Sequence, residues 1–213
     1  MTAPVYRVTT GRLPAPPTGP ATSLGFLVLK GVLLYEVTVC ERTTAELVGP
    51  GDLIDPSEPE PVSALPSSVA WSVLEQALLA DLNPDLWAGA GERGHVADAL
   101  LARATRRAQL SAVQRSITSH VRVDVRILAY LWHLADRFGV VQPGEVRLDL
   151  SLTHAVIARL IGARRPTVTT ALQRLIQLGY LRRDGRAFVL LGDAGSVAEL
   201  DGRSPARDFA VRS

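Results

Sequence analysis

Residues 152–191 determine the architecture of the C-terminal half of this chain, and they read LTHAVIARLIGARRPTVTTALQRLIQLGYLRRDGRAFVLL. Thr153 is a suitable N-cap, because its hydroxyl can accept a hydrogen bond from an unpaired backbone N–H of the first helical turn. An apolar stripe follows at Val156, Ile157, Leu160 and Ile161, which is the pattern of one buried helix face. Gly162 permits the left-handed conformation that ends many helices. The stretch therefore begins with a short amphipathic helix between Thr153 and Gly162.

A second helix is expected after this turn. Pro166 suits the first helical turn, where its missing N–H costs nothing, and Gly179 marks the end. The predicted buried stripe is Val168, Leu172, Leu175 and Ile176. Arginine hydrogen-bonds guanine, and threonine contacts bases or the thymine methyl. The sequence therefore predicts four base contacts near the start of this helix, at Arg164, Arg165, Thr169 and Thr170.

Asp184-Gly185 lies between two strand-like runs, which is a strong hairpin signal. A helix, a turn, a second helix and a basic hairpin are the layout of a winged helix-turn-helix, which places its second helix in the major groove of DNA. The alternative is an ordinary helical hairpin with a solvated basic face. The predicted phosphate contacts are Thr153, His154, Thr167, Gln173, Arg174, Arg182, Arg183 and Arg186.

Apolar residues recur in a long segment without proline that precedes this domain, and they predict a helix over residues 91–120. Arg103 and Arg107 interrupt its apolar seam, so the pattern is an imperfect heptad suited to a short dimer contact. The alternative is a surface helix packed on its own domain. The predicted dimer residues are Val96, Leu100, Leu110, Val113 and Ile117.

The remaining segments complete the predicted organisation. Residues 1–22 are rich in Pro, Thr and Gly and are interpreted as a flexible arm. Three short strands are expected at 26–29, 32–39 and 45–48, followed by an acidic, proline-rich loop at 55–68. The expected domains are the arm, a sensor-like β-roll at 23–90, the helix at 91–120, the helix-turn-helix domain at 121–192 and a loose tail at 193–213.

Charge is distributed unevenly along the 213 residues, although the net charge is only +2. Residues 1–90 hold 4 Lys and Arg against 10 Asp and Glu, whereas residues 91–191 hold 16 against 7. Basic charge therefore accompanies the helix-turn-helix, as phosphate binding requires. A single cysteine excludes a disulfide framework and a cysteine-ligated cluster, and the four histidines lie beyond the roll, so no metal or other cofactor is expected. The single cysteine favours the reducing cytoplasm, and the absence of a long apolar run indicates no membrane span.

The order of these elements resembles the Crp/Fnr family of bacterial transcription regulators. The resemblance is strongest in LTHAVIARLIGARRPTVTTALQRL and fair in the strands around Lys30-Gly31 and in the Gly51-Asp52 turn. It implies an α+β fold with a small jelly-roll-like β-roll, a long dimerisation helix and a C-terminal winged helix-turn-helix, and it makes 69–82 two closing strands of the roll. It also implies a homodimer that binds an inverted repeat of double-stranded DNA, with RNA polymerase and a small-molecule effector as further partners.

The sequence departs from the family pattern at two places, in the residues that contact bases and in the cyclic-nucleotide site. Arg165 occupies the position at which a residue of the family commonly contacts guanine. Pro166 and Thr170, however, occupy positions where many members have a Glu and a second Arg, so the family's best-known operator is not expected. The Gly-Glu pair of the cyclic-nucleotide site is missing, and no Arg or Lys occurs between Arg42 and Arg93. Because a buried phosphate needs a cationic partner, cyclic AMP is not expected to bind in the family's usual way. No nucleophile or phosphate-loop motif indicates an enzyme. The alternative function is a dimeric effector-sensing or adaptor protein that binds a protein partner.

Overall fold

A computed structural model of the chain describes residues 3–13, 25–55, 65–82 and 93–202. The chain divides into two compact units, Met1–Val113 and Gln114–Ser213, and the boundary falls inside the long helix α1 (Arg93–Thr118). No helix in the described ranges is long and apolar enough to cross a membrane.

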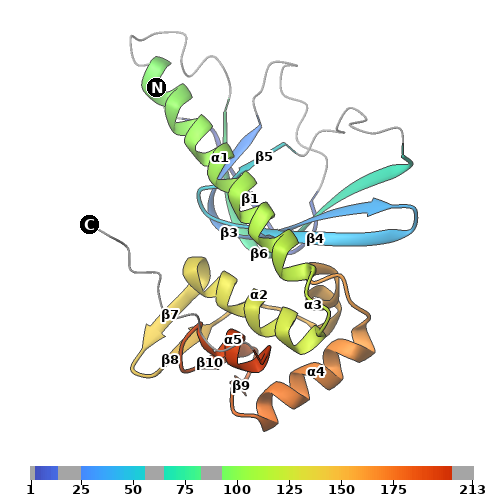
Figure 1. Cartoon of the computed structure of the whole chain (residues 1–213). Coiled ribbons are helices and arrows are strands. Elements are labelled where there is room, and N and C mark those ends of the chain that lie inside the picture. The colour runs from blue at the N-terminus through green and yellow to red at the C-terminus, as the bar shows by residue number, and fades with distance from the viewer. Residues whose placement is uncertain (1–2, 14–24, 56–64, 83–92, 203–213) are drawn as a thin grey trace. The chain divides into compact units, whose positions relative to one another are not determined.

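The first unit is built on one antiparallel sheet (Figure 1). Its long central strands β3 (Phe26–Val39) and β6 (Ser67–Asp81) pair with each other along most of their length. The strand β4 (Arg42–Val48) extends the sheet beside β3, and the short β5 (Leu53–Ile54) also pairs with β3. The roll predicted from the sequence is thus present in the described residues.

Two of the predicted strand breaks do not separate strands. The runs 26–29 and 32–39 form the single strand β3, which passes through Gly31 with a φ of +91°. The break expected near Glu75 within 69–82 does not end a strand either, since β6 is continuous; instead the register of β3 and β6 shifts between Val28 and Leu33 on β3, opposite residues 73–79 of β6. A bulge at a glycine absorbs extra residues without ending the strand, which a propensity pattern does not reveal.

Part of the predicted flexible arm also belongs to this sheet. The strand β1 (Val5–Val8) pairs with residues 77–80 of β6, and β2 (Gly11–Arg12) pairs with residues 72–73. The ring of Tyr6 stands edge-on to Phe26, with 5.9 Å between the ring centroids. Pairing with an open edge of β6 orders a segment whose composition alone favours disorder. Residues 1–2 and 14–22 of the arm lie outside the described residues.

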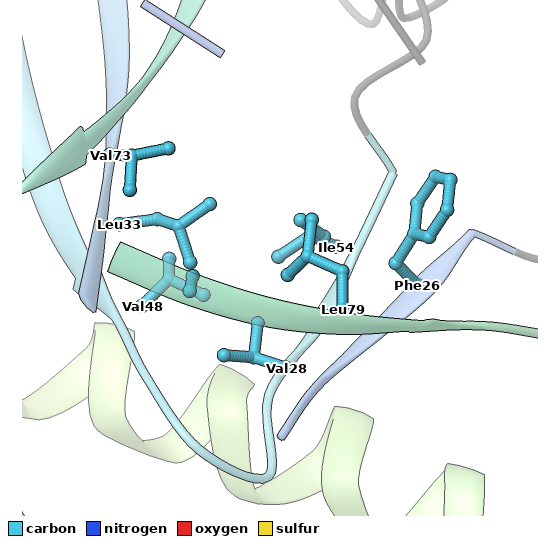
Figure 2. Packing of buried hydrophobic residues seen from close by; sticks show 8 residues of the cluster. Phe26, Val28, Leu33, Val48, Ile54, Val73 and Leu79 are labelled. Carbon is cyan, nitrogen blue, oxygen red and sulfur yellow. The ribbon is translucent and has the colours of Figure 1, made fainter. Parts of the chain in front are cut away.

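The interior of the roll is a cluster of aliphatic side chains and one phenylalanine (Figure 2). Every second residue of a strand faces the same side of the sheet, so β3 and β6 supply most of this cluster. The buried members are Phe26, Val28, Leu33, Val48, Ile54, Val73, Ala77 and Leu79.

In the first unit, α1 contacts the roll through the two arginines that interrupt its apolar seam. Arg103 donates from Nη1 to the carbonyl of Gly51 at 2.9 Å. Arg107 pairs with Glu46 at 3.4 Å and stacks over the ring of Tyr35. Val96, Leu100, Arg103, Arg107 and Leu110 recur at alternating spacings of four and three residues, so they share one side of the helix. The predicted dimer seam is therefore turned partly toward the chain's own roll.

The second unit contains the remaining helices and a four-stranded sheet. Its elements in chain order are α2 (Val123–Phe138), β7 (Gly139–Gln142), β8 (Glu145–Leu148), α3 (His154–Leu160), α4 (Arg165–Gln177), β9 (Leu181–Asp184), β10 (Ala187–Leu191) and α5 (Ser196–Leu200). The strands lie in the order β7, β8, β10, β9 (Figure 1). Phe188, Leu128, Leu131 and Leu175 are fully buried in this unit.

Ile117 of the predicted dimer seam also lies inside this second unit, where only 8% of its surface is exposed. Its neighbour Gln114 donates to the carbonyl of Leu160 at 2.9 Å. A side chain that is already buried in its own chain has little surface left for a second copy, so this burial does not favour the predicted dimer contact at Ile117. Val113, by contrast, is 47% exposed.

The predicted loose tail begins with an ordered helix. In α5, the hydroxyl of Ser196 accepts a hydrogen bond from the indole N–H of Trp132 at 3.3 Å, and Leu200 is buried. The carbonyl of Leu200 accepts a hydrogen bond from the guanidinium of Arg122. These contacts with α2 order residues 193–202, which the polar composition of the segment does not predict. Residues 203–213 lie outside the described part of the chain.

We expect Gly31→Ala to reduce the free energy of unfolding by about 3 kcal/mol. A Cβ at this position would lie 2.4 Å from the carbonyl oxygen of Gln76, and φ is already in the left-handed region. Gly11→Ala is the matched control, because its φ is also positive but no atom lies within 4 Å of the added Cβ; its expected cost is about 1 kcal/mol. Urea denaturation followed by circular dichroism measures both, and equal losses would contradict the steric argument.

Candidate nucleic-acid interface

The helices α3 and α4 form the predicted helix-turn-helix. The hydroxyl of Thr153 accepts a hydrogen bond from the backbone N–H of Val156 at 3.2 Å and so caps α3. Gly162 adopts a φ of +64° in the turn, and Ala163 N–H donates to the carbonyl of Ala158 at 2.8 Å. The cap at Thr153 and the glycine turn are both confirmed. The Thr153 hydroxyl only accepts in this cap, so its O–H proton remains available to donate in the predicted contact with phosphate.

The two sides of α4 differ sharply in burial. Val168, Ala171, Leu172 and Leu175 are buried against the rest of the second unit. Ile176, which the apolar pattern assigns to the same stripe, is 40% exposed. Arg164, Arg165, Thr167, Thr170, Gln173 and Arg174 are exposed, and Thr169 is half-buried. The side of α4 predicted to face DNA is thus left open by the fold of this unit.

Arg164 and Arg165 are exposed at the start of α4, and in the described part of the chain neither guanidinium group has a hydrogen-bond or ion-pair partner. Arg164 is the N-cap residue but its side chain makes no capping bond. A guanidinium carries five N–H donors, which suit the two acceptors of a guanine edge or the oxygens of a phosphate. These two side chains are therefore available for an anionic or acceptor-rich ligand.

The threonines of α4 differ in how their hydroxyls are used. Thr169 and Thr170 donate to the carbonyls of Arg165 and Pro166, at 3.2 and 3.3 Å. Nδ1 of His154 lies 2.9 Å from the Thr169 hydroxyl oxygen. Because the hydroxyl proton is directed to a carbonyl, which only accepts, the His154 Nδ1–H is the donor in that contact. A neutral His154 then has only an acceptor left at Nε2, which does not favour its predicted contact with phosphate.

Arg174 is tied to a buried carboxylate. Its Nη1 lies 3.3 Å from Oδ2 of Asp124 at the start of α2, and Arg122 binds the same carboxylate with two nitrogens, at 2.7 and 3.1 Å. Only 6% of the Asp124 side chain is exposed, whereas 57% of Arg174 is. Arg174, predicted as a phosphate contact, thus also connects α4 to α2.

The Asp124 carboxyl is charged because its neighbours outweigh its burial. Burial raises the pKa of Asp124, but the hydrogen bonds from Arg122 and from the N–H of Val125, and the charges of Arg122 and Arg174, hold this pKa below its usual value. A buried carboxylate with two guanidinium partners and a backbone donor is satisfied rather than strained.

The wing, formed by β9 and β10, carries arginines that are each engaged within the domain. Arg182 donates to both carboxylate oxygens of Glu145 at 2.9 Å, and Arg186 donates to Asp149 at 3.0 Å. Arg147 pairs with Asp184, and this pairing lowers the pKa of that carboxyl. Arg183 stacks on Phe188, with its guanidinium carbon 4.0 Å from the ring centroid, and burial lowers its pKa.

The ion pairs Glu145–Arg182, Arg147–Asp184 and Asp149–Arg186 form a regular ladder across β10. In each pair the residue near β9 follows its partner near β8 by 37 positions. The offset is constant because β8 and β9 both run antiparallel to β10 and are therefore parallel to each other. These pairs were not predicted from the sequence, although the charges of Glu145, Arg147 and Asp149 alternate in sign opposite to those of Arg182, Asp184 and Arg186. The wing arginines are thus locally neutralised, and the structure does not leave them as free as predicted.

Comparison with known proteins identifies the domain. Residues 125–195 match the family model of the Crp-like helix-turn-helix domain. This range includes α3, the turn, α4 and the wing, so the winged helix-turn-helix predicted from the sequence is confirmed. The resemblance to the Crp/Fnr family of transcription regulators is also confirmed, and the chain has the α+β fold that it implies.

Relatives and solved structures agree with this assignment. The chain is 33% identical over 109 residues to the CRP-like cAMP-activated global transcriptional regulator of Mycobacterium tuberculosis, and the aligned part covers 50% of this chain and 47% of that protein. The chain thus spans about half the length of the curated relatives that it matches. FixK2 from Bradyrhizobium japonicum has a similar fold at 17% identity, with a TM-score of 0.68 over 97% of this chain and 100% of that one.

A cyclic nucleotide-binding domain containing protein from Listeria monocytogenes is similar in fold at 16% identity, with a TM-score of 0.70 over 92% of this chain and 91% of that one. Likeness at these identities extends the shared fold to the β-roll. The curated relatives are named as regulators, in agreement with the prediction that the chain is not an enzyme.

We expect Asp124→Asn to reduce the free energy of unfolding at pH 7 by about 2–4 kcal/mol, because it leaves two guanidinium groups without their shared carboxylate. Since the pKa of Asp124 is lowered in the folded protein, its contribution is complete above the unfolded value of about 3.9 and is lost as the pH falls below it. Urea denaturation at pH 7 and pH 3 should therefore show a smaller difference between variant and wild type at pH 3.

The control for this variant is Asp136→Asn, which removes an exposed carboxylate from the same helix. We expect it to change stability by no more than about 0.5 kcal/mol. A loss for Asp124→Asn that is no larger than the control, or that does not shrink at low pH, would contradict the structural role of the buried carboxylate.

Proposed function

We propose that this chain is a sequence-specific DNA-binding transcription regulator that acts as a homodimer on an inverted-repeat operator, independently of cyclic AMP. The observation that carries the proposal is the exposed start of α4. There the guanidinium groups of Arg164 and Arg165 have no partner among the described residues, while the opposite side of the same helix is buried. A helix held by one face, with unengaged guanidinium groups at its N-terminal end, suits insertion into the major groove.

Within this proposal the polar residues divide into two roles. Arg165 and Arg164 hydrogen-bond base edges, and Thr169 and Thr170 contact bases beside them. Thr167 and Gln173 contact phosphates, because they are exposed on α4. The wing arginines and Arg174 reach phosphates only by sharing or exchanging their carboxylate partners. Most of the favourable electrostatic interaction with DNA is therefore assigned to α4 rather than to the wing.

The proposed dimer forms through α1, in keeping with the family resemblance. The side of α1 that carries Arg103 and Arg107 contacts the roll of the same chain. Ala97, Leu101, Ala104 and Ala108 recur at spacings of four, three and four residues, all four are exposed, and Leu101 is 67% exposed. Spacing of this kind makes a continuous apolar seam. We therefore assign the first contact between two copies to this seam, together with Val113.

The proposed independence from cyclic AMP rests on the charges of the roll. In its described ranges, no Arg or Lys follows Arg42 along the roll strands. The cations that α1 brings to the Gly51-Asp52 turn and to β4 are Arg103 and Arg107, and they are engaged with Gly51 and Glu46. A phosphate would have to displace these contacts or remain unpaired, which is costly. The further proposed partners are RNA polymerase and a small-molecule effector of another class, and the proposed location is the cytoplasm.

The proposal is tested by in vitro selection of random DNA duplexes with purified, ligand-free protein at moderate salt. Enrichment of an inverted repeat whose half-sites are about one helical turn apart supports the proposal. Affinity for the selected duplex should fall steeply with salt, since phosphate contacts release counterions. Failure to enrich any sequence, or an affinity insensitive to salt, would overturn it in favour of a dimeric adaptor that binds a protein partner.

We expect Arg165→Ala to weaken binding to the selected duplex by about 1–3 kcal/mol and to relax specificity at one base pair of each half-site. The physical reason is the loss of a bidentate contact with a base edge. Arg186→Ala is the matched control, with a smaller expected effect because the Arg186 guanidinium is already paired with Asp149. Fluorescence anisotropy with selected and random duplexes measures both. Equal loss on all sequences would mean that Arg165 contacts phosphate only.

We expect no saturable binding isotherm when cyclic AMP is titrated into the protein in a calorimeter. Cyclic AMP should also leave the unfolding temperature unchanged, because a ligand that binds only the folded state must stabilise it. Binding that saturates at micromolar cyclic AMP, with a matching rise in the unfolding temperature, would contradict the argument from the missing cation in the roll.

A further inference from the structure

The exposed face of α4 carries three threonines, and their hydroxyls are not equivalent. Thr167 is exposed, and its hydroxyl has no hydrogen-bond partner among the described residues. Thr170 is also exposed, but its hydroxyl donates to the carbonyl of Pro166 at 3.3 Å. The hydroxyl of Thr169 donates to the carbonyl of Arg165 and accepts from His154. Only Thr167 therefore has an unused hydroxyl donor.

The hydrogen bond at Thr170 determines which part of its side chain a ligand meets. A threonine carries one hydroxyl and one methyl group on Cβ, and the hydroxyl has a single proton. When this hydroxyl turns back to the carbonyl four residues earlier, the proton is used within the helix. The hydroxyl can then no longer donate to a base and can only accept, and the methyl group is the apolar part of this exposed side chain.

The hydrogen-bonding groups that the bases present in the major groove restrict which contacts Thr170 can make. Guanine N7 and O6, adenine N7 and thymine O4 all require a donor, which Thr170 no longer supplies. Thymine differs from the other bases by the C5-methyl group, which forms apolar contacts with threonine methyl groups. Such a contact removes apolar surface from water and needs no hydrogen bond.

Resting on the proposed function, we propose that Thr170 recognises thymine by packing its methyl group against the C5-methyl of one thymine in each half-site. Thr170 is thus a specificity-determining residue, and its hydroxyl takes no part in readout. Arg165 contacts a guanine edge about 1.4 turns earlier on the same helix, since the two positions are five residues apart on a helix of 3.6 residues per turn.

Two matched substitutions separate the methyl from the hydroxyl. Thr170→Val keeps the methyl and removes the hydroxyl, whereas Thr170→Ser keeps the hydroxyl and removes the methyl. The DNA offers the reciprocal change, because deoxyuridine in place of thymidine removes only the C5-methyl group. The duplex is the one enriched by selection, with each thymine of the half-site replaced in turn, and binding is measured by fluorescence anisotropy.

At one thymine of each half-site, replacement by deoxyuridine should weaken binding of the wild type about fourfold per half-site, the amount expected for one lost methyl contact. Thr170→Val should bind like the wild type and keep this sensitivity. Thr170→Ser should bind the thymine duplex about fourfold more weakly per half-site and be indifferent to deoxyuridine at that position. Circular dichroism of each variant verifies that the exposed substitution leaves the fold intact.

The opposite pattern would overturn the inference. Weak binding by Thr170→Val with normal binding by Thr170→Ser would assign the contact to the hydroxyl. A selected half-site without thymine, or insensitivity of both variants and of every thymine position, would show that Thr170 does not read this base. In these cases the selected duplex still binds more tightly than random DNA, so the proposed function stands. If no duplex is selected, the proposed function and this inference fail together.

Discussion

The second unit depends on one buried carboxylate. Asp124, at the start of α2, is held by two guanidinium groups, Arg122 from the preceding turn and Arg174 from α4. Arg122 also donates to the carbonyl of Leu200 at the end of α5. A buried charge requires such partners, because an unpaired carboxylate in the interior is costly. Three helices that are far apart in the sequence are thereby fixed around a single charged group, and α4 is held with its polar side toward solvent.

The arrangement of α4 also explains why its arginines play different roles. Arg174 lies where the helix meets α2, and its charge is used within the protein. Arg164 and Arg165 precede this contact and retain their hydrogen-bonding capacity. Charge alone does not distinguish these side chains, since all three are exposed arginines of one short segment. What separates them is the distance to the nearest carboxylate, which is a property of the fold.

The wing shows the same principle on a sheet. Its two strands share β10 with β8, so that carboxylates at Glu145 and Asp149 face the arginines near β9. Such exposed pairs contribute little to stability and are screened by salt, but they lower the positive charge that the wing presents to a polyanion. A high content of arginine in a hairpin is therefore a weaker indication of phosphate binding than an arginine without an acidic neighbour.

The sequence by itself determined the elements with local causes: the cap at Thr153, the glycine turn, the amphipathic faces of α3 and α4, and the hairpin at Asp184-Gly185. These depend on residues only a few positions apart, so pattern and propensity suffice. Only the tertiary structure decided that part of the N-terminal arm pairs with β6, that the arginines of α1 contact the roll, and that Asp124 and the carboxylates opposite the wing engage arginines 37 or more residues away. Such pairings follow from strand order and helix packing, and a linear pattern of charge and hydrophobicity does not specify which distant residues the fold brings together.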